Sequence, residues 1–204
     1  MSILEYNGGA VLAMAGKKCF AIACDQRLGI QFQTVAMNFE KVFQITERTF
    51  VGLTGLASDV QTIEQTLKFR ANLYELRENR EISPKAFSAM LSSMLYEKRF
   101  GPWFTEPIVA GLQADGTPFL SGMDLLGAPV FASDYVTSGT CVSNLHGMCE
   151  ALYKPDMEPT ELFEVVSQCL LAAVDRDAYS GWGATVHIIT EEGVLTRKLK
   201  GRQD

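Results

Sequence analysis

The strongest constraint on the fold is the order in which the spacing of apolar residues changes along the chain. Strand-like spacing predicts four strands before any helix, at 10–14, 19–24, 39–45 and 49–54. Helical spacing then predicts two helices, the first capped by Ser58-Asp59 and the second running from Pro84 towards Gly101. The rest of the pattern predicts three strands (108–112, 118–123 and 130–136), two helices (142–152 and 162–174) and two strands (183–190 and 194–199).

Tight turns between successive strands require antiparallel pairing. Many of the predicted strands are apolar at every position, which indicates sheets that are covered on both faces. Two antiparallel sheets that face each other, each with a helix pair outside, meet both requirements. We therefore expect an α+β fold, a four-layer α-β-β-α sandwich, in which residues 1–204 form one domain.

The charge and the hydrophobicity of the chain exclude several classes of partner and cellular location. The 204 residues have a formal net charge of -6, and no basic run is longer than Lys17-Lys18. This argues against a partner that is nucleic acid or an anionic membrane. The sequence has no uninterrupted apolar run of about 18 residues, and its start lacks the features of a signal peptide. We expect an intracellular protein whose partners are other proteins.

Cysteines and histidines offer little for metal or nucleophilic chemistry. The five cysteines form no CxxC pair and are predicted to be reduced thiols in the core. His146 and Cys149 are three residues apart on a predicted helix, and His187 lies in a predicted strand. A zinc cluster or a Ser/His/Asp triad needs more ligands than these. Both histidines are expected to be structural.

The stretch 8–41 is the best candidate for a reaction site. Asp25 ends the second predicted strand, and Lys41 lies within the apolar third one. Gly8 and Gly9 stand where a side-chain hydroxyl would complete the group. Without that hydroxyl, we interpret Asp25 and Lys41 as a buried structural ion pair.

Several features in this order resemble the proteasome beta-subunit family of N-terminal nucleophile hydrolases. They are the strand-turn-strand start that ends at Asp25, the strand lysine Lys41, Thr54-Gly55, Ser138-Gly139 and the run Asp175-Arg176-Asp177-Ala178-Tyr179-Ser180-Gly181. The runs MSILEYNGGAVLAM, YEKRFGPWFTEPIVAGL and SGTC narrow the resemblance to one type of eukaryotic beta subunit. The resemblance covers essentially the whole chain and implies the N-terminal nucleophile hydrolase fold, which is the sandwich expected above.

The resemblance also implies roles for individual residues. In active members the nucleophile is a mature N-terminal threonine, released by self-cleavage after a glycine, and its own amine is the base. That position falls on Gly9, with Asp25 and Lys41 beside it. The supporting residues of the family fall on Ser138, Asp177 and Ser180. Because glycine has no hydroxyl, these residues are implied to be remnants of a catalytic site in a non-catalytic, structural subunit.

Two alternatives remain open. Removal of Met1 would give Ser2 a free amine beside its hydroxyl, which would make an active amidohydrolase possible. Ser2 lies seven residues before Gly9, about 23 Å of extended chain, so the segment would have to fold back. The second alternative is a free-standing binding module.

The resemblance further implies a place in an assembly. The family forms a hetero-oligomer of twenty-eight beta and alpha subunits, in which two beta rings stack between two alpha rings. This proteasome core particle acts in ATP- and ubiquitin-dependent protein degradation in the cytoplasm and the nucleus. Ser121, Met123 and Asp124 are the implied candidates for contact with the substrate cleft of a neighbouring active subunit.

No cofactor is implied as a requirement, but a structural Mg²⁺ is possible. In related subunits, backbone carbonyls at the positions of Val174, Asp177 and Ser180 can bind such a cation, and oxygen ligands suit it. The carboxylates of Asp204 could reach the equivalent site of a subunit across the ring interface. The alternative is a turn that only ends a helix.

Overall fold

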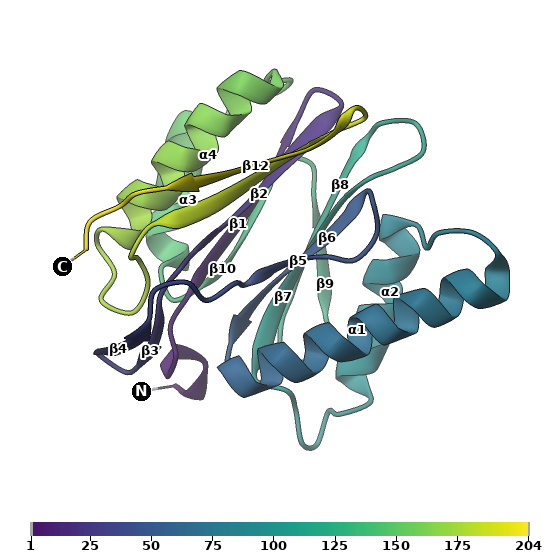
Figure 1. The fold of residues 1–204 in the computed structure, drawn as a ribbon, viewed down its shortest axis with the longest axis horizontal. Helices are drawn as coiled ribbons and strands as arrows, with labels where there is room; N and C mark the ends of the chain where they lie inside the picture. The colour runs from purple at the N-terminus through teal and green to yellow at the C-terminus, as the bar shows by residue number, and fades with distance from the viewer. Residues whose placement is uncertain (1, 204) are drawn as a thin grey trace.

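The computed structural model describes residues 2–203 as two five-stranded antiparallel sheets that face each other, with helices on their outer faces (Figure 1). The first sheet has the order β10-β1-β2-β11-β12, with β1 (Ala10–Gly16), β2 (Cys19–Asp25), β10 (Tyr135–Gly139), β11 (Ala184–Thr190) and β12 (Gly193–Leu199). The second has the order β5-β6-β7-β8-β9, with β5 (Val42–Gln44), β6 (Thr49–Gly55), β7 (Thr105–Leu112), β8 (Pro118–Met123) and β9 (Pro129–Ala132).

Two helix pairs complete the four layers. Helices α1 (Ala57–Glu78) and α2 (Pro84–Tyr96) cover the second sheet, and α3 (Val142–Leu152) and α4 (Pro159–Val174) cover the first (Figure 1). Among residues 2–203, no helix combines the length and the apolar character needed to cross a membrane. The predicted α-β-β-α sandwich is confirmed.

Burial explains why the strands are apolar at every position. In β2, Cys19, Ala21 and Ala23 pack in the core under α3 and α4. The alternate residues Phe20 and Ile22 pack in a second core between the sheets. A third core lies between the second sheet and α1 and α2. Each central strand therefore contributes to two cores, which requires apolar side chains on both faces.

Three local predictions were wrong or incomplete. Helix α1 begins at Ala57 with Leu56 as its N-cap, and the carboxylate of Asp59 accepts a hydrogen bond from the backbone N–H of Phe104 instead (2.8 Å). The single strand predicted at 130–136 is two strands in different sheets, β9 and β10. Two short elements were not predicted, namely the hairpin of β3 (Leu28–Ile30) and β4 (Gln33–Ala36) and the 3-10 helix η1 (Ile3–Glu5).

Candidate functional site

Gly9, Asp25 and Lys41 meet at one end of the first sheet. Gly9 leads into β1, Asp25 ends the neighbouring strand β2, and Lys41 precedes β5 of the facing sheet. A Cβ atom placed on Gly9 would lie 2.7 Å from Cε of Lys41 and 3.7 Å from Oδ1 of Asp25. The position that the resemblance assigns to the nucleophile therefore faces the Asp–Lys pair directly.

Asp25 and Lys41 form a closed, buried network. Nζ of Lys41 lies 2.8 Å from Oδ1 of Asp25, and the two side chains are 3% and 0% exposed. Nζ also donates to the carbonyl oxygens of Arg27 (2.7 Å) and Asp25 (3.4 Å), so each of its three hydrogens has an acceptor. The Asp25 carboxylate accepts backbone N–H groups from Ala10, Arg27 and Gly181. The buried pair therefore has hydrogen-bond partners for all three Lys41 hydrogens and for both carboxylate oxygens of Asp25.

The supporting residues form two separate hydrogen-bonded groups close to Gly9. The Ser138 hydroxyl lies 2.6 Å from that of Thr54 and donates to the carbonyl of Glu106 (2.8 Å). The Asp177 carboxylate accepts from the hydroxyls of Ser180 (2.6 Å) and of Thr140. The structure thus places all three predicted supporting residues around the remnant site.

Thr140 connects the second group to Gly9. Its backbone N–H donates to the Gly9 carbonyl at 2.8 Å, and its hydroxyl lies 3.3 Å from the same oxygen. Thr140 belongs to the SGTC run that carried part of the resemblance, but no role was predicted for its side chain, because nothing in the local pattern distinguishes this threonine from a solvent-exposed turn residue.

The N-terminal segment 2–8 folds back over the site. The carbonyls of Tyr6 and Asn7 accept the backbone N–H groups of Gln31 (2.8 Å) and Gly29 (3.1 Å), so the segment lies along the β3–β4 hairpin. The Asn7 side chain donates to the carbonyl of Gly29 and accepts from the N–H of Ala57, both at 2.9 Å. This side chain therefore joins the segment to the β3–β4 hairpin and to the start of α1.

Ser2 comes close to the remnant site as a result. A cavity of about 210 Å³ is lined by Ser2, Leu4 and Glu5 on one side and by Thr54, Gly55, Glu106, Gly139 and Thr140 on the other. The Ser2 hydroxyl accepts the N–H of Leu4 (3.3 Å), and the Ser2 backbone nitrogen donates to the Glu5 carboxylate (3.0 Å). Both functional atoms of Ser2 are therefore part of a capping box of η1.

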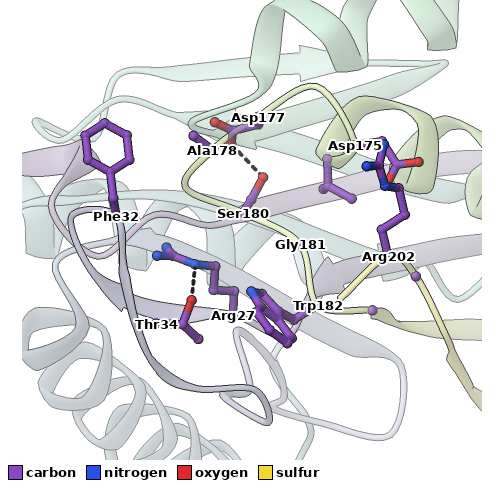
Figure 2. A pocket seen from close by; sticks show the side chains of 13 residues that line it. Arg27, Phe32, Thr34, Asp175, Asp177, Ala178, Ser180, Gly181, Trp182 and Arg202 are labelled. Atoms are coloured by element: carbon purple, nitrogen blue, oxygen red, sulfur yellow. Dashed lines mark hydrogen bonds between the residues drawn. The ribbon is translucent and has the colours of Figure 1, made fainter. Parts of the chain in front are cut away.

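Arg27 is a buried residue of the site that the sequence analysis missed. Its guanidinium donates to the hydroxyl of Thr34 (3.0 Å) and to the carbonyls of Tyr179 (2.7 Å) and Gln31 (3.0 Å). Burial lowers the pKa of Arg27, and the carboxylates of Asp25 and Asp177 oppose that effect. Figure 2 shows the guanidinium in the wall of a pocket, beside Thr34. Arg27 holds the β3–β4 hairpin to the turn after α4.

The turn for which the resemblance implies a bound cation lies in the wall of the same pocket. The pocket has a volume of about 370 Å³, and its lining includes Val174, Asp175, Asp177, Ser180 and Arg202 (Figure 2). The carbonyl of Val174 accepts the N–H of Asp177 at 3.1 Å but keeps a second lone pair. Within residues 2–203, no group of three or more His, Cys, Asp or Glu side chains could hold a metal ion. Asp204 lies outside the described residues.

The residues assigned to a neighbouring cleft require a correction. Ser121 is fully buried and its hydroxyl lies 3.2 Å from that of Ser88, while Met123 packs in the core under α1 and α2. Their side chains do not reach the surface, because β8 is a central strand of the second sheet. Asp124 is exposed, and its Oδ1 accepts the N–H groups of Leu126 and Ala128.

Both histidines make local side-chain contacts. His146 bonds to the hydroxyl of Thr137 (3.2 Å) and His187 to that of Thr196 (2.8 Å). All five cysteines are buried free thiols, as predicted.

Comparison with known proteins identifies the family to which this chain belongs. The family model described as proteasome subunit matches residues 5–189, and the chain therefore belongs to the proteasome subunit family. Members of this family assemble with other proteasome subunits. Within the family, the chain is similar to beta type-3 subunits. It is 57% identical to "Proteasome subunit beta type-3" of Dictyostelium discoideum, 58% to that of Drosophila melanogaster and 53% to that of Picea mariana, each over the full length of both chains.

Proposed function

We propose that this chain is a non-catalytic, architectural beta subunit of the proteasome core particle. The observation that carries the proposal is the position of Gly9, where a Cβ would face Lys41 and Asp25 but no hydroxyl exists. Covalent catalysis requires a nucleophilic atom at that point. The Lys41 ammonium has all of its hydrogens bonded and no lone pair, so it cannot act as a base in this state.

The rival function is an amidohydrolase that uses Ser2. The fold-back that such an enzyme needs is present, and Ser2 lines the cavity in front of Gly55 and Gly139. However, its hydroxyl and its nitrogen are both held by η1, and the nitrogen donates to Glu5. With Met1 attached, the Ser2 nitrogen is a peptide N–H group, which donates to Glu5 and cannot serve as a base. The contacts of Ser2 therefore favour the architectural role.

The deciding experiment is the intact mass of this chain after the native particle has been treated with a broad epoxyketone inhibitor. We expect no inhibitor adduct on this chain, while the threonine-bearing subunits of the same particle are labelled and serve as the positive control. An adduct that maps to Ser2 would establish the rival function. A chain that begins at Gly9 or Ala10 would mean that the segment is removed and that the nucleophile has been misplaced.

The same proposal includes the quaternary state and the cellular location. The chain would occupy one position in each beta ring of a twenty-eight-subunit particle in the cytoplasm and the nucleus, and would act there in ubiquitin-dependent degradation. Similarity to beta type-3 subunits over the full chain supports this. Native gels of cytoplasmic and nuclear fractions should show the chain at the size of the particle. A species near 22.5 kDa would instead support a free binding module.

Asp124 is the remaining candidate for contact with the substrate cleft of a neighbouring subunit. Its charge is exposed, whereas Ser121 and Met123 are enclosed. Because Oδ1 of Asp124 also holds the loop at Leu126 and Ala128, two variants are needed. Asp124→Asn keeps an acceptor for the loop and removes the charge, and Asp124→Ala removes both. Unchanged trypsin-like cleavage by particles with Asp124→Asn would rule out a role of the charge.

A structural Mg²⁺ at the turn 174–180 is the final part of the proposal, and no cofactor is required for the architectural role. The backbone oxygens of Val174, Asp177 and Ser180 would hold the ion and would supply only charge and rigidity. Two observations support the proposal: backbone oxygens suit a hard cation, and the pocket lining carries the carboxylates of Asp175 and Asp177 beside Arg27 and Arg202. Calorimetric titration of the metal-free particle with Mg²⁺ tests the site, with Asp175→Asn as the variant that should weaken it.

A further inference from the structure

The dipeptide Asn7-Gly8 combines a chemically labile sequence with close packing. Asparagine is a labile residue, and a glycine after it favours deamidation because glycine has no side chain to hinder its own backbone nitrogen. Asn7-Gly8 is the one Asn-Gly pair in the sequence. In the folded chain both residues are buried, and Asn7 is only 8% exposed.

The contacts of the two residues show why the fold needs this labile pair. Nδ2 of Asn7 donates to the carbonyl of Gly29, and Oδ1 accepts the N–H of Ala57, the first residue of α1, both at 2.9 Å. Gly8 has a φ of 69°, and a Cβ atom there would overlap the carbonyl oxygen of Tyr179. An amide is therefore required at position 7 and a glycine at position 8.

We propose that Asn7-Gly8 is a deamidation site that is closed while the segment 2–8 lies on the β3–β4 hairpin and reactive once the segment is released. The backbone nitrogen of Gly8 attacks Cγ of Asn7, a C–N bond forms, and Nδ2 leaves as ammonia with the proton of the attacking nitrogen. Water then opens the resulting five-membered imide at either carbonyl. One water is consumed, one ammonia is released, and position 7 becomes aspartate or isoaspartate.

The contacts of Asn7 oppose this reaction in the docked state. The two side-chain hydrogen bonds hold opposite ends of the amide, so its rotation towards the Gly8 nitrogen breaks at least one of them. The backbone carbonyl of Asn7 is also held, because it accepts the N–H of Gly29 at 3.1 Å. Burial keeps away the water that opens the imide. The reaction therefore requires a local opening of the segment, and the free energy of that opening sets its rate.

Neither product fits the place that Asn7 occupies. In aspartate an oxygen replaces Nδ2, so two acceptors face each other at the Gly29 carbonyl. In isoaspartate the main chain runs through the former side chain and gains a methylene group, which displaces Gly8 from its close contact with Tyr179. Release of the segment thus leaves a chemical mark that weakens its return. These contacts are the same whether or not the remnant site is catalytic, so the inference does not depend on the proposed function.

The first experiment incubates the assembled particle in mildly alkaline buffer, either native or unfolded in guanidinium chloride, and follows the peptide that contains Asn7 by mass spectrometry. We expect conversion to aspartate and isoaspartate to be at least about tenfold slower in the native particle. Two variants of the full-length chain are then compared in guanidinium chloride, where folding has no influence. Gly8→Ala should slow the conversion, and the matched control Gly9→Ala, which leaves the Asn-Gly pair intact, should not.

The second experiment uses Asn7→Asp, which reproduces one of the products. Amide hydrogen exchange at Gly29, whose N–H donates to the backbone carbonyl of Asn7, should be faster in particles with this variant than in the wild type. Equal rates of conversion of Asn7 in native and unfolded particles would overturn the proposal, because docking would then give no protection. Unchanged exchange at Gly29 in Asn7→Asp would also overturn it, since the modified segment would still dock.

Discussion

At the scale of single residues, the backbone conformation and the packing around position 9 explain why a glycine stands there. Its φ of 151° lies in a region that L residues rarely adopt, and a Cβ would lie 2.7 Å from Cε of Lys41. Lys41 cannot move away without losing its contacts with Asp25 and Arg27. The glycine is therefore required by the packing around it, in addition to being unable to react.

The first prediction concerns Gly9→Ala. We expect a loss of about 1–3 kcal/mol in the free energy of unfolding, because the backbone is strained and the neighbour is fixed. Urea denaturation measures it. Gly147→Ala is the matched control, since Gly147 lies within α3 and has open space at its Cβ position. It should gain roughly 0.5–1 kcal/mol from helix propensity. Equal effects of the two substitutions would contradict this interpretation of Gly9.

The buried ion pair gives the second prediction. Lys41→Met leaves the Asp25 carboxylate buried without its counter-ion, and should cost about 3–5 kcal/mol. Lys154→Met removes a lysine from an exposed pair with Glu161, and should cost about 1 kcal/mol or less. The midpoints of urea unfolding of the two variants would be compared. A loss below about 1 kcal/mol for Lys41→Met would show that backbone N–H groups alone stabilise the carboxylate.

At the scale of elements, spacing predicted the helices and hairpins because each buries a regular stripe of apolar residues. It failed where the chain crosses from one sheet to the other. Only two polar residues, Ser133-Asp134, separate the end of β9 from the start of β10, and this short interruption does not by itself indicate a change of sheet. The β3–β4 hairpin was missed because its two strands have only three and four residues, which is too short for a pattern of alternation to be distinguished from a loop.

The third prediction concerns the N-terminal segment. Asn7→Ala removes one buried and one partly buried hydrogen bond and leaves the carbonyl of Gly29 and the N–H of Ala57 without that partner. We expect a loss of about 1–3 kcal/mol and faster amide hydrogen exchange at Gly29 and Gln31. Asn72→Ala, on the exposed face of α1, should change neither quantity. Unaltered exchange at Gln31 would mean that the segment is held by other contacts.

The pairing of β11 with β12 gives a prediction about pH. Burial lowers the pKa of His187 below its ordinary 6.5, and the charge of Glu40 only partly offsets this. The unfolded chain therefore binds a proton more readily than the folded chain, so stability is full above pH 6.5 and falls as the pH drops below it. Urea midpoints at about pH 7.5 and pH 5.5 measure the fall. His187→Gln should make it smaller, and an equal fall in both proteins would contradict the assignment.

At the scale of the whole molecule, the residues of the remnant site could be predicted from the sequence, but the contacts that hold the surrounding segments against it could not. Asp25, Lys41 and the glycine pair could be identified because the resemblance fixes their spacing. The roles of Arg27 and Asn7 depend on carbonyl groups of Tyr179 and Gly29, and a sequence carries no pattern for acceptors on the backbone. Such contacts become visible only once the fold brings distant turns together.

The last prediction concerns assembly. Four apolar side chains stand exposed on or beside the β3–β4 hairpin, namely Ile30, Phe32, Val35 and Met37. Exposed clusters of this kind mark contact surfaces, and members of the family assemble with other subunits. Val35→Asp should lower incorporation of the chain into particles at least about tenfold, because an unpaired carboxylate in an interface costs more than the roughly 1.4 kcal/mol that this factor represents.

Competition between tagged wild-type and variant chains in the same cells measures the effect of Val35→Asp on incorporation. Val35→Ile keeps the apolar contact and should incorporate normally. The urea midpoint of the unassembled Val35→Asp chain should match that of the wild type, because Val35 is exposed and belongs to none of the three cores. Normal incorporation of Val35→Asp would show that the hairpin remains at the solvent surface in the particle, and its apolar residues would then require another partner.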